Sequence, residues 1–123
     1  MKTIAIITAR SGSSGIRNKN IKILKNKPLI YHTVKFAKKL KFLDKIIFST
    51  DSKKYLKIAQ KYYPFNNSLR PKRLATKYTK SIDVIKYLIN LEKKIGNFYD
   101  AVLILEPTSP FRKLNDFKKA YQK

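Results

Sequence analysis

The residues best suited to chemistry form a short segment, residues 9–20, that follows an apolar run at the N-terminus. Gly12 and Gly15 permit tight backbone turns, and the hydroxyls and amides of the segment can donate hydrogen bonds to phosphate oxygens. Arg10 and Lys19 add fixed positive charge. The segment matches neither the dinucleotide pattern G-x-G-x-x-G nor the P-loop pattern G-x-x-x-x-G-K-[ST]. Composition alone therefore leaves two interpretations open, a phosphate-binding loop and a flexible polar loop.

A second candidate segment, residues 68–76, contains Arg70 and Thr76. Arginine carries a planar fork of hydrogen-bond donors that suits a pyrimidine carbonyl or ring nitrogen, so Arg70 is the candidate reader of a nucleotide base. The alternative is a surface arginine stiffened by Pro71. Taken by themselves, the residues favour that alternative.

A third candidate segment, residues 106–112, follows another apolar run and begins with Glu106. Its prolines stiffen the backbone. Thr108 and Ser109 offer hydroxyls, and Arg112 could bind the carboxylate of an acidic sugar. A proline-rich connection between a strand and a helix is the alternative interpretation.

The elements expected around these segments place them at one edge of a sheet. Apolar runs without alternation predict parallel strands covered on both faces, at residues 3–8, 45–49 and 101–105. Helical periodicity predicts helices at about residues 28–40, 52–62, 79–95 and 114–121. Strands alternating with helices predict a doubly wound α/β fold, Rossmann-like, in three layers around a mostly parallel sheet. In such folds ligands bind beyond the carboxyl ends of the strands, where the candidate loops would meet.

Several other polar residues are expected to have structural roles. Asp51 is a helix N-cap candidate in preference to a nucleotide or magnesium ligand, and Ser52 is its competitor for that role. Asp83 and Glu92 are expected to be surface partners for lysines. His32 is expected to pack or to face solvent.

Length and composition predict one small domain spanning residues 1–123, because 43% of the side chains are hydrophobic. No apolar run is long enough to cross a bilayer and no signal-peptide pattern is present, so we expect a cytoplasmic protein with no membrane partner. The chain has no cysteine, which excludes disulfides and thiolate chemistry. Its single histidine excludes a multi-histidine metal site.

The net charge of +22 is the most unusual bulk property. Charge of this size attracts polyanions and therefore suggests nucleic acid as a partner. Most of the lysines, however, fall on the expected solvent faces of helices and not in one block interleaved with aromatic residues. A solvated surface is therefore the favoured interpretation, and no specific nucleic-acid partner is expected.

In their order along the chain, these segments resemble the motifs of CMP-sialic acid synthetases (acylneuraminate cytidylyltransferases). Residues 9–20 resemble the family signature A-R-x-G-S-K-G-[IL]-x-x-K-N. The further matches are Lys27-Pro28-Leu29-Ile30 with His32-Thr33, Ser49-Thr50-Asp51, Arg70-Pro71 with Leu74-Ala75-Thr76, and residues 105–110. The resemblance spans nearly the whole chain. It implies a nucleotidyltransferase that transfers CMP from CTP to a sialic-acid-type (nonulosonic) sugar and releases pyrophosphate.

The resemblance also assigns residues to roles. The CTP phosphates would be surrounded by Arg10, Gly12, Ser13, Ser14, Gly15, Lys19 and Asn20. Arg10 and Lys19 would be catalytic, because their charges would offset the negative charge that develops as pyrophosphate leaves. The cytosine and ribose would be bound by Arg70 and Thr76, and the sugar by Glu106, Thr108, Ser109 and Arg112.

The chain departs from the family pattern at Ser14, at Arg17, where proline is frequent, at Lys77 and at Glu106. Ser14 stands where lysine is usual, which removes a phosphate-contacting cation that Arg17 could partly replace. Lys77 stands where aspartate is frequent. Glu106 stands where glutamine commonly contacts the sugar, and an ionised carboxylate would repel an acidic sugar unless a cation intervenes. The identity of the sugar therefore stays open among sialic, legionaminic, pseudaminic and Kdo-like acids.

Magnesium is the cofactor expected with CTP, because triphosphate chemistry normally uses such an ion to neutralise developing charge. The chain has only seven acidic residues and no evident acidic pair, so the principal ligands are expected outside this chain. In the family, these ligands and the usual dimerisation segment lie beyond the position of Lys123. The chain is therefore expected to be a truncated N-terminal part, with CTP and an acidic nine-carbon sugar as partners and a homodimer as a possible assembly.

Two other classes of function stay open. One is a non-catalytic nucleotide-binding fragment or subunit, which would bind CTP without turnover. The less favoured one is a basic nucleic-acid-binding module, which would show steep salt dependence and no preference for CTP.

Overall fold

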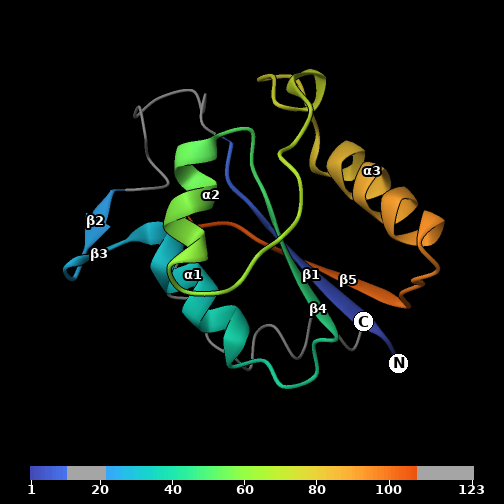
Figure 1. The fold of residues 1–123 in the computed structure, drawn as a ribbon, viewed down its shortest axis with the longest axis horizontal. Helices are drawn as coiled ribbons and strands as arrows, with labels where there is room; N and C mark the ends of the chain where they lie inside the picture. The colour runs from blue at the N-terminus through green and yellow to red at the C-terminus, as the bar shows by residue number, and fades with distance from the viewer. Residues whose placement is uncertain (11–21, 108–123) are drawn as a thin grey trace.

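The computed structural model describes residues 1–10 and 22–107, and its centre is a parallel sheet (Figure 1). The sheet has the strand order β4-β1-β5, with β1 at Thr3–Thr8, β4 at Lys45–Ser49 and β5 at Ala101–Leu105. Ile6 of β1 lies opposite Ile47 on one side and Ile104 on the other. All three predicted strands and their parallel direction are confirmed. Residues 3–7 of β1 are buried throughout, as expected for a strand covered on both faces.

Helices cover both faces of this sheet (Figure 1). On one face lie α1 (Leu29–Lys38) and α2 (Lys53–Gln60), whose Val34 and Tyr55 belong to the same buried cluster as Ile7. On the other face lies α3 (Ser81–Lys94), whose Val84 packs with Ile4. Side chains that alternate along β1 thus enter two different cores. The predicted three-layer, Rossmann-like fold is confirmed.

The helix ends follow local chemistry. The Ser52 hydroxyl accepts the backbone N–H of Tyr55 at 3.1 Å, so Ser52 and not Asp51 caps α2. At the start of α3, the Asp83 carboxylate accepts the backbone N–H of Lys80 at 3.1 Å. Asp83 therefore stabilises a helix N-terminus, where the expectation was a surface partner for a lysine side chain. Gly96, with φ +90°, follows α3 in the left-handed conformation that glycine tolerates best.

Two short elements were not predicted. The first is a hairpin of β2 (Ile23–Leu24) and β3 (Lys27–Pro28), joined by Lys25 and Asn26 with φ of 51° and 68°. His32 Nε2 donates a hydrogen bond to Leu24 O at 2.7 Å and so fixes this hairpin to α1. The second is a 3-10 turn, η2 (Lys72–Leu74).

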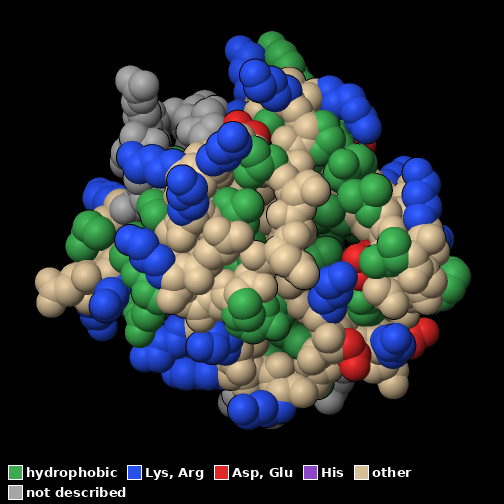
Figure 2. Space-filling view, viewed as in Figure 1, with side chains coloured by type: hydrophobic (Ala, Val, Ile, Leu, Met, Phe, Trp, Pro, Cys, Tyr) green, Lys and Arg blue, Asp and Glu red, His purple; other side chains and the backbone are tan. Residues whose placement is uncertain are grey.

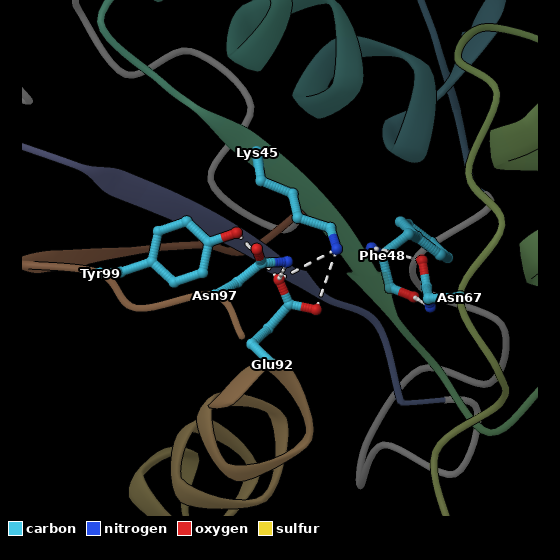
Figure 3. Close-up of polar contacts among 6 residues, drawn as sticks. All are labelled: Lys45, Phe48, Asn67, Glu92, Asn97 and Tyr99. Carbon is cyan, nitrogen blue, oxygen red and sulfur yellow. Dashed lines mark hydrogen bonds and ion pairs between the residues drawn. The ribbon is translucent and has the colours of Figure 1, made fainter. Parts of the chain in front are cut away.

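Glu92 at the end of α3 is a lysine partner, as predicted, but it is buried and not on the surface (Figure 3). Both of its carboxylate oxygens accept from Lys45 Nζ at 2.9 Å, and Oε1 also accepts from Tyr99 Oη at 2.8 Å and Asn97 Nδ2 at 3.4 Å. Burial and the neighbouring Glu92 raise the pKa of Tyr99 to about 12, which keeps its hydroxyl a donor. The cluster ties α3 to the start of β4 and to the segment entering β5.

Asn67 covers the outer edge of β4 (Figure 3). Its Nδ2 donates to Phe48 O at 2.8 Å, and its Oδ1 accepts from Phe48 N at 3.4 Å. The amide side chain therefore takes the hydrogen-bonding place of a neighbouring strand, which protects an otherwise unpaired strand edge.

Over residues 1–10 and 22–107, every helix is too short or too polar to cross a bilayer. The helix predicted at residues 114–121 lies outside the described residues.

Candidate nucleotide-binding site

Buried hydrogen bonds join the carboxyl ends of β1 and β4. The Thr50 hydroxyl, with no exposed surface, donates to Ala9 O at 2.6 Å, and Ala9 N donates to Ser49 O at 2.9 Å. Arg70 N in turn donates to Thr50 O at 2.7 Å. Two segments far apart in the sequence are thereby fixed at one edge of the sheet, where a doubly wound fold binds ligands.

At this edge Arg10 and Arg70 line the same hollow, which has a volume of about 140 Å³. The other lining residues are Thr8, Thr79, Lys80, Ser81 and Val84. Among these described lining residues, three carry a positive charge and none is acidic. The hollow therefore suits an anionic or acceptor-rich ligand.

Arg70 is held by the fold in one orientation. Arg70 is only 8% exposed, and its Nε donates to Ser49 Oγ at 3.0 Å. Nη2 donates to Ser49 O at 3.1 Å, and Nη1 donates to Leu74 O at 3.2 Å. A guanidinium has five N–H donors, so these contacts within the described residues leave one N–H on each terminal nitrogen. The surface-arginine alternative for Arg70 is therefore wrong.

The electrostatics of the hollow follow from this burial. Burial lowers the pKa of Arg70, the charge of Asp51 opposes that shift, and the charge of Arg10 lowers the pKa further. Two guanidinium groups thus repel each other across the hollow. A ligand with negative charge or strong acceptors would relieve this repulsion.

The N-terminus of α3 forms another wall of the hollow. Ser81 is the first residue of α3, Lys80 is its N-cap and Thr79 precedes the cap, at the end where the backbone N–H groups of a helix leave partial positive charge. Thr76 positions this wall: its N–H donates to Thr79 Oγ1 at 3.1 Å, and the two threonine hydroxyls lie 3.0 Å apart. Thr76 itself is exposed and does not line the hollow.

The other predicted site residues are distributed as follows. Glu106 is exposed and directly follows β5. Leu105, the last residue of β5, lies opposite Ile7 of β1, so Glu106 stands at the same edge of the sheet as the hollow. Glu106 does not line the hollow. The remaining candidates lie outside the described residues: Gly12, Ser13, Ser14, Gly15, Lys19, Asn20, Thr108, Ser109 and Arg112.

The sequence interpretation did not include Thr79, Lys80 and Ser81 among the candidate residues. The signal available was the predicted helix start near residue 79, only a few residues after Arg70. A helix that begins at the ligand edge of a doubly wound sheet brings its N–H groups to the ligand.

The described residues do not form a metal-ligand cluster from protein side chains alone. In residues 1–10 and 22–107 there is no group of three or more histidine, cysteine, aspartate or glutamate side chains arranged to hold a metal. Asp51 is an acidic residue whose charge acts on Arg70 and opposes the lowering of its pKa.

Comparisons with known proteins identify the family to which the chain belongs. The family model described as Cytidylyltransferase matches residues 4–123. N-acylneuraminate cytidylyltransferase of Escherichia coli is 43% identical over 111 residues, which are 90% of this chain and 25% of the relative. CMP-N,N'-diacetyllegionaminic acid synthase of Legionella pneumophila is 37% identical over 99% of this chain and 53% of its own length. Pseudaminic acid cytidylyltransferase of Campylobacter jejuni is 33% identical over 100% of this chain and 53% of its own length.

Solved structures show the same fold. CMP:2-keto-3-deoxy-manno-octonic acid synthetase complexed with CTP has a TM-score of 0.77 and 20% identity, over 99% of this chain and 46% of that chain. This chain thus spans about half the length, or less, of the relatives it matches. The family model nevertheless matches all of this chain except the first three residues. The chain therefore belongs to the cytidylyltransferase family.

Proposed function

We propose that this chain binds CTP in the hollow between Arg10, Arg70 and the start of α3. It would be the nucleotide-binding part of an enzyme that transfers CMP from CTP to a nonulosonic sugar acid. The observation that carries the proposal is the placement of two guanidinium groups at one hollow beside a helix N-terminus. The names of the relatives, which include three such sugar acids, support the reaction class.

Arg70 is suited to recognising cytosine. Its remaining N–H donors point in directions set by Ser49 and Leu74, so a ligand must present acceptors to match them. Cytosine presents acceptors at O2 and N3, whereas uracil has an N–H donor at N3. A fixed donor fork therefore favours CTP over UTP.

Arg10 is suited to binding the phosphates. In the proposed reaction, the anomeric hydroxyl of the sugar attacks the α-phosphorus, and the bond to the bridging oxygen of pyrophosphate breaks. Negative charge builds on the leaving group, and Arg10 together with Lys19 would offset it without a covalent enzyme intermediate. The role of Lys19 rests on the sequence, because this residue lies outside the described residues.

Magnesium would supply further charge neutralisation on the triphosphate. Its principal ligands are expected outside this chain. The sugar site likewise stays a proposal, with Glu106, Thr108, Ser109 and Arg112 as candidates.

Pyrophosphate release tests the reaction. A form of the protein extended beyond Lys123 is incubated with CTP, magnesium and, in separate reactions, N-acetylneuraminate, legionaminic acid, pseudaminic acid and Kdo. Release with one of these sugars and CTP, but not with ATP, supports the proposal and identifies the sugar. CTP binding without release under all four conditions favours the non-catalytic nucleotide-binding alternative. Failure to bind CTP refutes both.

A further inference from the structure

The α1 and α2 layer carries a concentration of positive charge that the nucleotide site does not use. Residues 22–43 and 52–82 contain no aspartate or glutamate. Within these stretches, the lysines of α1, of α2 and of the residues just after them are exposed: Lys35, Lys38, Lys39, Lys41, Lys53, Lys54, Lys57 and Lys61. In Figure 2, Lys and Arg side chains surround this part of the surface and Asp and Glu side chains are sparse there.

A cluster of lysine and tyrosine side chains lies where α1 meets the hairpin and the end of α2. The ammonium groups of Lys27 and Lys35 lie 5.5 Å and 5.8 Å from the centre of the Tyr31 ring. The Tyr31 ring meets the Tyr62 ring edge to face at 4.8 Å, and Lys38 Nζ donates to Tyr62 O at 3.3 Å. We call these five residues the lysine–tyrosine seam. It holds three cations close together at the surface.

We propose that the seam and the neighbouring lysines of α1 and α2 bind the phosphate backbone of nucleic acid without regard to sequence. A closely spaced row of phosphates matches a surface where cations recur along two adjacent helices and acidic residues are missing from both. Asp44 and Asp51, which follow α1 and precede α2, are the nearest acidic residues in sequence and mark the borders of the surface.

The distribution of apolar side chains argues against an anionic membrane as the partner. Helices that lie on membranes combine lysines with exposed large apolar residues that enter the bilayer. Among residues 1–10 and 22–107, Ile23 of the hairpin is the exposed large apolar side chain near the seam, whereas Ile82, Leu91, Ile95 and Phe98 lie on or after α3. α3 packs on the opposite face of the sheet (Figure 1).

The surface is separate from the proposed CTP site. The hollow is lined by residues of β1, Arg70 and the start of α3, and none of the seam residues lines it. Loss of one kind of binding therefore does not entail loss of the other.

Fluorescence anisotropy with a short labelled DNA duplex of mixed sequence tests this inference. The full chain is titrated over a series of salt concentrations. The seam variant replaces Lys27, Lys35 and Lys38 with glutamine, and the matched control replaces Lys86, Lys93 and Lys94 of α3 with glutamine, which removes the same charge. Circular dichroism and CTP titration check that both variants fold.

The seam variant is expected to bind the duplex roughly tenfold more weakly at low salt, and the slope of log K against log salt should fall by about two to three. The α3 variant should stay close to wild type. Equal weakening of both variants would show that only net charge matters and would overturn the assignment. Absence of binding at physiological salt, or binding to anionic vesicles in preference to the duplex, would also overturn it.

Discussion

Arg70 is anchored to Ser49, the last residue of β4, through two hydrogen bonds: Nε to Ser49 Oγ at 3.0 Å and Nη2 to Ser49 O at 3.1 Å. The orientation of this guanidinium is therefore fixed by the central sheet, and a third hydrogen bond, from Nη1 to Leu74 O at 3.2 Å, adds support from the η2 turn. A binding group held this way does not lose conformational freedom when a ligand arrives.

Replacing Arg70 with lysine keeps the charge but removes the fork. A single ammonium group cannot donate to Ser49, to Leu74 and to a ligand in the directions that the planar guanidinium group uses. We therefore expect Arg70→Lys to weaken CTP binding at least about tenfold. The free energy of unfolding should fall by about 1–3 kcal/mol, because buried acceptors lose their donor. Calorimetric titration with CTP and thermal unfolding measure the two effects.

Arg73→Lys is the matched control. Arg73 is exposed and lies over the Tyr87 ring at 5.6 Å, away from the lining of the hollow. We expect near-wild-type CTP binding. If Arg70→Lys also binds CTP like the wild type, Arg70 does not read the base.

Glu92→Gln should destabilise the fold without altering CTP recognition directly. The substitution breaks the ion pair with Lys45, whose side chain is 35% exposed and can turn to water, so the expected loss is about 1–3 kcal/mol. Chemical denaturation measures it. The comparison is Asp100→Asn, where an exposed carboxylate accepts the backbone N–H of Lys2 at 2.8 Å; a smaller loss is expected there. A larger loss for Asp100→Asn would contradict the buried cluster.

The same cluster predicts an acid dependence of stability. Burial raises the pKa of Glu92, but hydrogen bonds from Lys45 and Tyr99, the Lys45 charge and a hydrogen bond from Asn97 outweigh it, so the net pKa lies below the ordinary 4.5. A pKa that is lower in the folded state adds stability above about pH 4.5, and this contribution disappears as pH falls through the folded value. The stability difference between wild type and Glu92→Gln should therefore be constant near neutrality and shrink below about pH 4.5. A difference that grows on acidification would contradict this assignment.

Ser14→Lys should tighten CTP binding if this position faces the phosphates, because it restores the cation usual in the family. Calorimetry with CTP and with cytidine separates the effects: the gain should appear with CTP and not with the uncharged nucleoside. Unchanged or weaker CTP binding would count against a phosphate-facing Ser14.

The strands and long helices could be predicted from sequence because burial requires continuous apolar side chains. β1 and β5 are apolar runs without alternation, and α3 repeats its apolar residues at helical spacing. The hairpin of β2 and β3 could not be found in this way. Its strands have two residues each, and its turn uses Lys25 and Asn26 where glycine would have been the clear signal.

The candidate site was predictable only in part, because its geometry depends on contacts distant in sequence. The position of Arg10 just after β1 predicted that it lies at the carboxyl edge of the sheet, where it lines the hollow. Nothing local to Arg70 indicates burial, which comes from Ser49, twenty-one positions earlier. For Glu92, the predicted lysine partner is correct and the predicted surface position is wrong. The side chain becomes buried because Lys45, Asn97 and Tyr99 surround it only once α3 packs on the sheet.

The most direct test of a cytosine-reading hollow is magnesium-dependent binding of CTP compared with UTP, ATP and GTP by calorimetry. A donor fork fixed by Ser49 predicts that CTP binds at least about tenfold more tightly than UTP, and that Arg70→Lys reduces this preference. Equal binding of all four nucleotides would contradict the account.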